Sequence, residues 1–534
     1  MALRKSFVVT LALTSPGMLL ASPAVTPASA ASAIAKIDPQ VAPSKSLLVE
    51  QVTFTGNQSF SSEVLQAQIA DDLGKPMTLA DLRSLADKVR QYYVNQGYKL
   101  ARVVVPSQSF TEGKPVSLVV LEGWLDKIEV SGSERYAEQQ VIDTLQSSGI
   151  QLGQAFTFDA VETGLTRLNR QSGIRVDSVL RPGAKQGATD LVVRVTELPR
   201  VQGSLEINNH GSKNTGETRI IPTVEWSNVT GRGDSLNFLG VQSLGGSGTF
   251  FARVGYNVPI NVTGRRFSTY YSQGNITVGG ALSPLNIRGD NRAFGLGILQ
   301  ERILARNKID TFEAWLEAQD LNQQSLSTVI ADDKVRKLRL GFTREHTDDE
   351  GRSLLALQVH QGLGSALGGM ANNSPASSRA ISGADGRFTK LTAEWTRLQR
   401  INQRLLLIPR LSAQFALDPL VVGEQITIGG FNSVTGHAPS FRSGDSGVVA
   451  NLESRYAVLP DDDRFQFVAR LDHGRIFVND TFIGQRRSDD LSGMSLGFIV
   501  TPISRLFLRV DYAKPLGQRS DESQYIYLQA RYTF

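Results

Sequence analysis

The final stretch of the chain, Tyr525–Phe534, reads YIYLQARYTF and bears on the choice between two kinds of β-structure. The apolar positions are Ile526, Leu528, Ala530, Tyr532 and the terminal Phe534, and the positions between them include Gln529, Arg531 and Thr533. Such alternation alone also fits a soluble antiparallel sandwich. A membrane strand, however, needs one face for lipid and one for water, and a last strand that pairs with the first leaves no free edge. An apolar face that runs in register to the chain end therefore favours a transmembrane barrel.

The same alternation fills the chain from Val201 onward. Segments of about ten residues are separated by clusters of Gly, Asn, Asp and Ser. Clear examples lie at 390–395 and 505–512. We count roughly sixteen such segments, which predicts an antiparallel β-barrel over residues 201–534 with a lumen wide enough for water or an extended chain.

Composition limits the remaining classes. Residues 1–30 have the layout of a signal peptide: Arg4 and Lys5, an apolar stretch, and Ala28-Ser29-Ala30 as a cleavage site. The chain has no cysteine, which excludes disulfides and thiol chemistry. A net charge of +5, spread along the chain, argues against nucleic acid as a partner. No later segment is apolar enough for a membrane helix, a limit that does not apply to a barrel.

Two segments ahead of the predicted barrel match each other. QVTFTGNQSFSSEVLQAQI starts at Gln51, and KIEVSGSERYAEQQVIDTL starts at Lys127, about 76 residues later. In both, a short strand ends at a glycine, Gly56 or Gly132, and two helices and two strands follow. The pattern predicts two β-α-α-β-β domains, at 47–123 and 124–200, after a short linker at 31–46.

This order, together with NQGYKLARVVVPSQSFTEGKPVSLVVLEG at 95–123, resembles the POTRA domains of outer-membrane translocation barrels. Two α+β scaffold modules of unspecified role are the alternative. The aromatic chain end, with Tyr532 and Phe534 on one face, resembles the C-terminal signature of bacterial outer-membrane barrels. The expected fold is a transmembrane antiparallel β-barrel of about 16 strands preceded by two α+β POTRA domains.

Nearly the whole mature chain resembles the two-partner secretion transporters, the TpsB family. Their longest loop folds into the lumen with a Val-Arg-Gly-aromatic motif. Here the stretch GFNSVTGHAP at 430–439, between the eleventh and twelfth strand segments, is similar to that loop, which we expect near 423–447. The motif positions hold Val434, Thr435, Gly436 and His437. ARLDHGRIF at 469–477 is similar to the family's Asp-x-Gly strand motif, with Asp472 and Gly474.

In the family, the arginine of the loop motif pairs with the aspartate of the strand motif. This sequence has Thr435 in place of that arginine. Thr435 offers only a neutral hydrogen bond to Asp472. Arg442, or a protonated His437, could replace the arginine. A solvated His437 without such a role is the alternative. Alternation places Arg470 on the lumen face with Asp472. Only 31–46 separates the cleavage site from the first repeat, so we expect no N-terminal plug helix.

The resemblance implies that the chain lies in the outer membrane with its POTRA domains in the periplasm, and passes an unfolded exoprotein of the large adhesin or haemolysin type outward without ATP. Capture by strand addition would use the POTRA edge strands, with Leu100, Arg102, Val104, Ile174 and Val176. Membrane lipid and the barrel-assembly machinery are the other expected partners. We expect no catalytic residue, cofactor or metal site, because the five histidines lack metal spacing and no Gly-x-Ser-x-Gly elbow occurs. A barrel-assembly insertase and a barrel lipase or protease are the alternatives.

Overall fold

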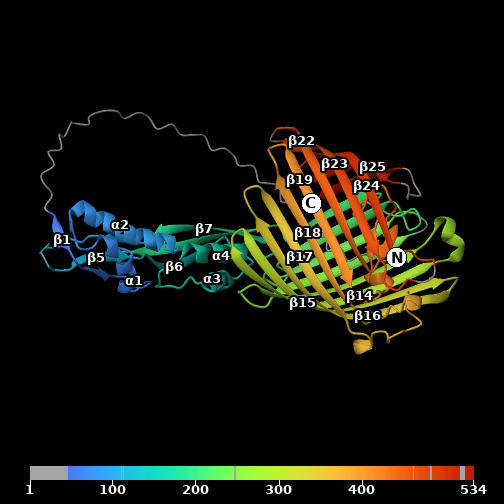
Figure 1. The fold of residues 1–534 in the computed structure, drawn as a ribbon, viewed down its shortest axis with the longest axis horizontal. Coiled ribbons are helices and arrows are strands. Elements are labelled where there is room, and N and C mark those ends of the chain that lie inside the picture. The colour runs from blue at the N-terminus through green and yellow to red at the C-terminus, as the bar shows by residue number, and fades with distance from the viewer. Residues whose placement is uncertain are drawn as a thin grey trace.

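The computed structural model describes residues 46–109, 111, 113–245, 248–460, 462–481, 484–517 and 524–534. The predictions of a signal peptide, of most of the linker and of a missing plug helix concern residues 1–45 and lie outside this part of the chain. Two small domains stand in line with a large barrel (Figure 1). No helix in the described residues is long and apolar enough to span a membrane.

The first small domain has a three-stranded sheet and two α-helices. Its elements are β1 (Leu47–Val49), β2 (Val52–Thr55), α1 (Ser62–Ala67), η1 (Ala70–Asp72), β3 (Lys75–Met77), α2 (Leu79–Asn95), β4 (Arg102–Val104) and β5 (Val116–Leu121). The sheet order is β2-β5-β4, and β1 pairs with β3 in a two-stranded sheet that the sequence pattern did not predict. Helix α2 begins at a capping box of Thr78 and Asp81 and buries Leu82, Leu85 and Val89 against the sheet.

The second small domain repeats this plan. Its elements are β6 (Trp124–Ser131), α3 (Glu138–Gln146), α4 (Phe158–Asn169), β7 (Ile174–Pro182) and β8 (Ala188–Glu197), and the sheet order is β6-β8-β7. Gly56 and Gly132 take φ values of +82° and +77° at equivalent turns. A Cβ at either glycine would lie 2.3 Å from a backbone oxygen of the neighbouring strand. The turn therefore requires glycine in both copies.

Each copy also fixes this turn with a glutamate. Glu122 accepts the backbone N–H groups of Gln58 and Ser59, both at 2.8 Å, and Glu197 accepts those of Glu134 and Arg135 at 2.9 and 2.6 Å. Burial raises the pKa of Glu197, but the hydrogen bonds from Arg135 and Glu134 outweigh burial, so that this pKa lies below the ordinary glutamate value. These carboxylates hold the strand end to the start of the first helix.

The barrel has sixteen antiparallel strands. They are β9 (Val201–Asn208), β10 (Arg219–Ser227), β11 (Ser235–Ser243), β12 (Thr249–Pro259), β13 (Arg265–Thr277), β14 (Arg288–Ala305), β15 (Lys308–Ser325), β16 (Thr328–Thr347), β17 (Gly351–Gly362), β18 (Thr389–Arg400), β19 (Leu405–Ala416), β22 (Ser446–Leu459), β23 (Asp462–Phe477), β24 (Ser488–Ile503), β25 (Leu506–Leu516) and β26 (Tyr525–Thr533). The barrel closes where β26 pairs with β9, from Gln529↔Asn208 to Thr533↔Ser204. This confirms the predicted barrel.

The wall separates apolar from charged side chains as the alternation predicts. In β26, Ile526 is 55% exposed on the outer surface, whereas Tyr527 beside it is 2% exposed and faces the lumen. In β25, Arg509 and Asp511 are buried, and Val510 between them is exposed. An apolar outer surface fits lipid, and the charged inner surface fits water or polar chain segments.

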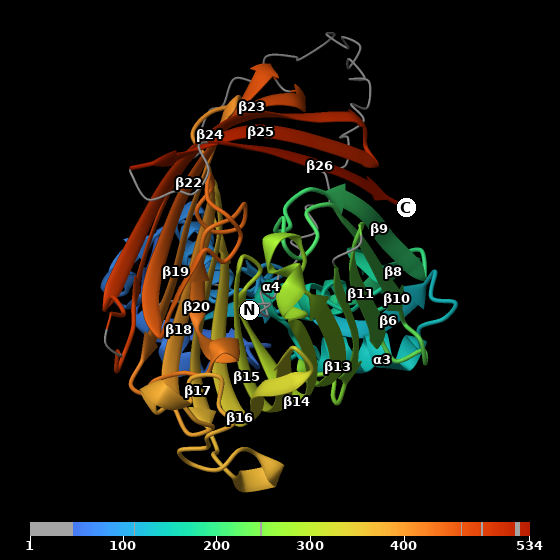
Figure 2. The same cartoon turned by 90° about the vertical axis from the view of Figure 1, so that its right-hand side faces the viewer.

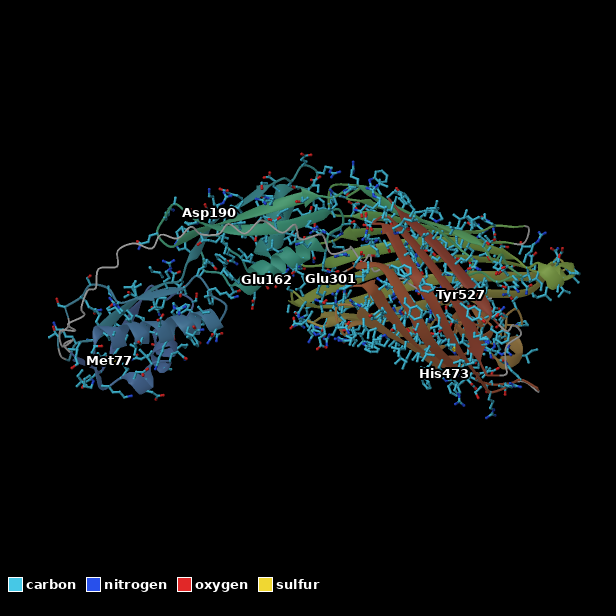
Figure 3. The ribbon with its side chains drawn as sticks, turned by 90° about the horizontal axis from the view of Figure 1, so that it is seen from above. Met77, Glu162, Asp190, Glu301, His473 and Tyr527 are labelled. Carbon is cyan, nitrogen blue, oxygen red and sulfur yellow. The ribbon has the colours of Figure 1, made fainter. Side chains whose placement is uncertain are left out.

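The second small domain is bound to the rim of the barrel. The guanidinium of Arg170 at the end of α4 donates to Glu301 of β14 at 2.9 Å and to Glu345 of β16 at 3.0 Å. Glu301 marks this junction in Figure 3. Ser172 donates to Ser227 of β10 at 2.7 Å. The start of β7 therefore lies at the mouth of the barrel.

Candidate functional site in the barrel lumen

The chain between β19 and β22, residues 417–445, forms a hairpin that we call the lumen hairpin. It contains η5 (Val422–Glu424), β20 (Ile426–Ile428) and β21 (Arg442–Gly444), and β20 pairs with β21 from Ile426↔Gly444 to Ile428↔Arg442. Figure 2 looks into the end of the barrel opposite the small domains and shows β20 inside the ring of strands. The hairpin therefore occupies the path through the barrel.

Glycine allows the tip of the hairpin, residues 429–437, to turn and to approach the wall. Gly430 and Gly436 take φ values of +90° and +79°. A Cβ at Gly436 would lie 2.4 Å from the backbone of Lys514 in β25. A Cβ at Gly493 of β24 would lie 1.9 Å from the carbonyl oxygen of Thr435. The tip is thus seated directly on the backbone of two wall strands.

One side of the hairpin packs against the inner wall. The buried apolar residues are Ile426, Ile428 and Val434 of the hairpin and Val449, Ile476 and Leu491 of β22, β23 and β24. Gly474, in the predicted strand motif, makes room for this contact, because a Cβ there would lie 3.0 Å from Val434 and 3.1 Å from Ile428. The glycine of the motif thus admits the side chains of the hairpin.

The carboxylate of Asp472 on β23 receives the tip. Thr435 donates its hydroxyl to Asp472 Oδ2 at 2.7 Å and its backbone N–H to the same oxygen at 3.0 Å. Asn451 of β22 donates to Oδ1 at 2.7 Å. Both Thr435 and Asp472 are buried. Two neutral donors of the hairpin therefore bind a buried carboxylate of the wall.

The positive charge beside Asp472 comes from the wall strand itself. Arg470, two residues earlier on β23, donates Nε to Asp472 Oδ1 at 2.7 Å. It also donates to the carbonyl oxygens of Phe431 at 2.7 Å and Ser433 at 3.0 Å. A single guanidinium thus neutralises the aspartate and holds two backbone groups of the tip.

Neither of the two expected substitutes for the loop arginine binds Asp472. Arg442 donates Nε to Asp489 of β24 at 2.9 Å, where the loop returns toward β22. His437 is 2% exposed, and its Nε2 lies 2.9 Å from the carbonyl oxygen of Ser492. Because His437 is buried, it is also not the solvated loop residue of the alternative interpretation. Alternation predicts that Arg470 shares the face of Asp472 but does not mark it as the cation, because the family pattern places the cation on the loop.

Phe431 of the tip lies in an aromatic and cationic cluster at the closing strands of the barrel. Its ring stacks on His210, which follows β9, with ring centroids 3.9 Å apart, and meets Tyr527 of β26 at 5.1 Å. The guanidinium carbons of Arg509 and Arg470 lie 5.0 and 5.8 Å from the centre of the same ring. No pattern in the sequence indicates that Phe431 contacts the strands that close the barrel.

A second set of contacts holds the hairpin near its start. Glu424 is buried, and its carboxylate lies 2.6 Å from Lys337 Nζ of β16 and 2.7 Å from Lys390 Nζ of β18. We call these three residues the Glu424 cluster. At the end of the hairpin, Asp445 pairs with Arg379 of the long loop between β17 and β18 and accepts the backbone N–H of Leu420 at 2.9 Å. The sequence patterns predict no role for either Glu424 or Asp445.

The predicted capture residues lie at the edges of the two small sheets. Arg102 and Val104 of β4 are exposed, and Leu100 just before it packs against the core of the second domain. Ile174 and Val176 of β7 have buried side chains. The predicted chain-end residues Tyr532 and Phe534 are both exposed. Among the described residues, no group of three or more His, Asp or Glu side chains could hold a metal ion.

A closed barrel with an apolar outer surface, a hairpin in its lumen and two β-α-α-β-β domains at one mouth defines an outer-membrane translocation barrel with POTRA domains. A family profile described as haemolysin secretion/activation protein ShlB/FhaC/HecB matches residues 187–500, and a ShlB-type POTRA profile matches residues 47–123. The chain therefore belongs to the ShlB/FhaC/HecB family. It is an outer-membrane transporter of two-partner secretion, and its POTRA domains lie in the periplasm.

Individual relatives agree with this assignment. The chain is 22% identical over 481 residues to the heme/hemopexin transporter protein HuxB of Haemophilus influenzae, covering 89% of this chain and 84% of that protein. It is 22% identical over 472 residues to the outer membrane transporter CdiB of Dickeya dadantii, covering 84% and 78%. The solved structure of CdiB from Escherichia coli superimposes with a TM-score of 0.76 at 18% identity, covering 94% of this chain and 93% of that one. The secretion family, and not the alternative of a barrel-assembly insertase, accounts for these similarities.

Proposed function

We propose that the lumen hairpin is the gate of this transporter and that its tip must leave Asp472 before an exoprotein can pass. The observation that carries the proposal is the position of the hairpin, which lies across the lumen with its tip on β23 (Figure 2). Hydrogen bonds from uncharged donors to a buried carboxylate are strong enough to hold the tip at rest, and they can part without separating an ion pair when an extended chain competes for the lumen.

Capture in the periplasm would use the sheet edges of the POTRA domains. In the part of the chain that the structure describes, strand β4 has only β5 as a neighbour, and β7 has only β8. Their unpaired backbone groups can add an extended segment of the unfolded exoprotein as a further strand, with affinity from main-chain hydrogen bonds. The partner in this proposal is one large adhesin or haemolysin-type exoprotein. No ATP, cofactor, nucleic acid or catalytic step is part of the proposal.

The membrane and the assembly of the barrel involve the outer surface. Exposed apolar residues of the wall, including Ile526 and Leu528, would contact lipid. The last strand, with Tyr532 and Phe534 exposed on the same surface, would be the segment that the barrel-assembly machinery recognises.

A reversible disulfide tests whether the hairpin must move. Since the chain has no cysteine, the pair Val434→Cys and Gly474→Cys would be its only thiols. A Cβ at Gly474 lies 3.0 Å from Val434 Cγ2, and in a disulfide the sulfur of one cysteine lies about 3 Å from the Cβ of the other. We expect the oxidised double variant to lose secretion and channel conductance, and reductant to restore both.

Val434→Cys alone is the matched control, which oxidation should leave unchanged. Secretion at the normal rate by the cross-linked variant would show that the hairpin stays in place during transport. The partner itself is identified by comparing the proteins of the culture medium and outer membrane with and without this gene. Loss of one large exoprotein supports a dedicated transporter, whereas depletion of many barrels contradicts it.

A further inference from the structure

The outer edge of the second POTRA sheet is closed at one residue. Among the strands that the structure describes, β7 pairs only with β8, so every second residue of β7 directs its backbone N–H and C=O away from the sheet. The N–H of Val176 donates to Asn169 Oδ1 at 2.7 Å, and the C=O of Val176 accepts Asn169 Nδ2 at 2.8 Å. Val176 is therefore an outward-directed position, and the amide of Asn169 takes the place that an added strand would use.

The edge is open beyond that residue. Ser178 and Leu180 follow Val176 by two and four positions, so their backbone groups point outward as well. Among the described residues, no hydrogen bond to these outward groups is found. Asn169 is itself held, because its Nδ2 also donates to the carbonyl oxygen of Leu165 at 3.0 Å within α4. The edge thus has a fixed closed position followed by an open stretch.

The exposed side chains along the open stretch are Val179 and Arg181, on the face of the sheet that α3 and α4 do not cover. Asp177, the preceding residue of that face, is also exposed, and its carboxylate lies 4.0 Å from the guanidinium of Arg194 on β8. In the first POTRA domain, Gln108 binds the backbone N–H and C=O of Ser117 on β5, so Ser117 directs these groups toward the side of β4. Val119, two residues later, directs its backbone groups to the same side and pairs with Val104. Val103, next to Val104, is therefore the outward-directed residue of β4. Val103 is flanked by exposed Arg102 and Val104. Both edges therefore present one arginine and one valine two residues apart.

We infer that Asn169 is a stop that confines strand addition on β7 to Ser178–Leu180, and that both edges select an extended segment with an acidic residue two positions from an apolar one. The inference rests on the capture step of the proposed function. Cross-strand pairing of a carboxylate with Arg181 or Arg102, and of an apolar side chain with the adjacent valine, supplies the selectivity. The exoprotein is the occupant, because it must be unfolded and extended to enter the lumen.

The position of the stop explains its use. Gly173, just before β7, packs against Ser227 of the barrel, where an added Cβ would lie 2.8 Å from the serine Cβ. The closed end of β7 is therefore the end at the barrel mouth, and the open stretch lies farther away (Figure 1). A segment bound to the edge ends its pairing before the rim and leaves the following residues free to enter the lumen.

Peptide binding to the purified full-length protein tests the stop. The probe is a fluorescein-labelled peptide with serine at every second position and with valine and glutamate by turns at the positions between. A second peptide has lysine in place of each glutamate. Fluorescence anisotropy should show the glutamate peptide binding at least tenfold tighter than the lysine peptide. Asn169→Ala should tighten the glutamate peptide roughly three- to tenfold, because it frees a further donor and acceptor. Arg181→Glu should weaken that peptide.

Two further variants make the result decisive. Ser178→Pro removes an outward N–H at a sheet edge, where proline is tolerated, and should weaken the peptide about tenfold. Asn169→Asp keeps the acceptor for Val176 N–H, so its affinity for the glutamate peptide should rise less than that of Asn169→Ala. It is used instead of Asn169→Ala if the alanine variant does not fold. Unchanged or weaker binding to folded Asn169 variants overturns the stop. Binding that Ser178→Pro does not affect, or equal binding of the lysine peptide, overturns the capture step, while the disulfide test of the hairpin is independent of both.

Discussion

The two attachments of the lumen hairpin differ in where their charges reside. At the tip, the carboxylate of Asp472 and the guanidinium of Arg470 both belong to β23, and the hairpin contributes neutral groups of Thr435. In the Glu424 cluster, the carboxylate belongs to the hairpin and the two ammonium groups belong to β16 and β18. Departure of the tip leaves an ion pair intact in the wall. Departure of Glu424 separates buried charges.

The comparison predicts the order in which the hairpin detaches. Breaking a buried ion pair by removing one partner costs about 3–5 kcal/mol, whereas a hydrogen bond from an uncharged donor to a charged group contributes about 1.5–3 kcal/mol. The tip should therefore release first, while the Glu424 cluster stays bound and acts as a pivot. Because the chain lacks cysteine, thiols at buried Val434 and Ile426 would report separately on the two attachments.

The largest expected effect is that of Glu424→Gln. The amide leaves Lys337 and Lys390 without their shared buried carboxylate, which should cost about 3–5 kcal/mol of folding free energy. Reactivity of Ile426→Cys toward a thiol reagent should rise, and channel openings should lengthen. Asp462→Asn, at an exposed ion pair of β23, is the control. An unchanged thiol reactivity would show that the cluster is not the pivot.

Arg470→Ala should have the next largest effect. Removing Arg470 breaks a buried ion pair, but Asp472 keeps Asn451 and the two donors of Thr435, so we expect a loss at the lower end of the range for such pairs, about 3 kcal/mol. Val434→Cys should become reactive, whereas Ile426→Cys should stay protected. A charge swap sharpens the test: Thr435→Arg alone buries a second cation beside Arg470 and should open the channel, and combining it with Arg470→Thr should restore closure. If the swap opens the channel further, the position of the charge does not govern the tip.

Thr435→Val should have a smaller effect. The variant loses the 2.7 Å hydrogen bond to Asp472 but keeps the backbone N–H, so the expected cost is about 1–2 kcal/mol. Planar-bilayer recordings should show more frequent, brief openings. Thr435→Ser, which retains the hydroxyl, should resemble the parent protein. Brief openings in both variants would point to packing of the methyl group as the cause.

Arg442→Ala should have the smallest effect. Its side chain is 38% exposed at the ion pair with Asp489, and exposed pairs contribute about 0.5 kcal/mol. Conductance should remain close to that of the parent protein. A large increase would mean that the loop arginine, although it does not bind Asp472, carries more of the closure than its geometry implies.

Local patterns sufficed for much of the fold. The period of two predicted about sixteen strands, and the sixteen observed strands place the GFNSVTGHAP stretch after the eleventh, as predicted. The repeated β-α-α-β-β pattern predicted both small domains. The pairing of β1 with β3 was missed, because these strands are three residues long and lack room for a periodic pattern.

The contacts of the site depend on distant parts of the chain. His210, Phe431 and Tyr527 meet only because the barrel closes with a particular register. Glu424 meets Lys337 and Lys390 because β16 and β18 lie close to β19 in the barrel, where the hairpin starts. Alternation did place Arg470 on the face of Asp472, but its bonds to the carbonyl groups of the hairpin follow from how deeply the hairpin is inserted.

The ring of Phe431 also links the hairpin to the folding of the barrel. Tyr527 belongs to the last strand and His210 follows the first, so the aromatic contact exists only when both chain ends of the barrel have met around the hairpin. Closure joins residues separated by more than 300 positions, which makes it a late and entropically costly event. A hairpin already seated on β23 offers a preformed surface on which the two strands can meet. The aromatic contact thus couples the seating of the hairpin to the pairing of β26 with β9, since Phe431 reaches both of its partners only when that pairing has formed.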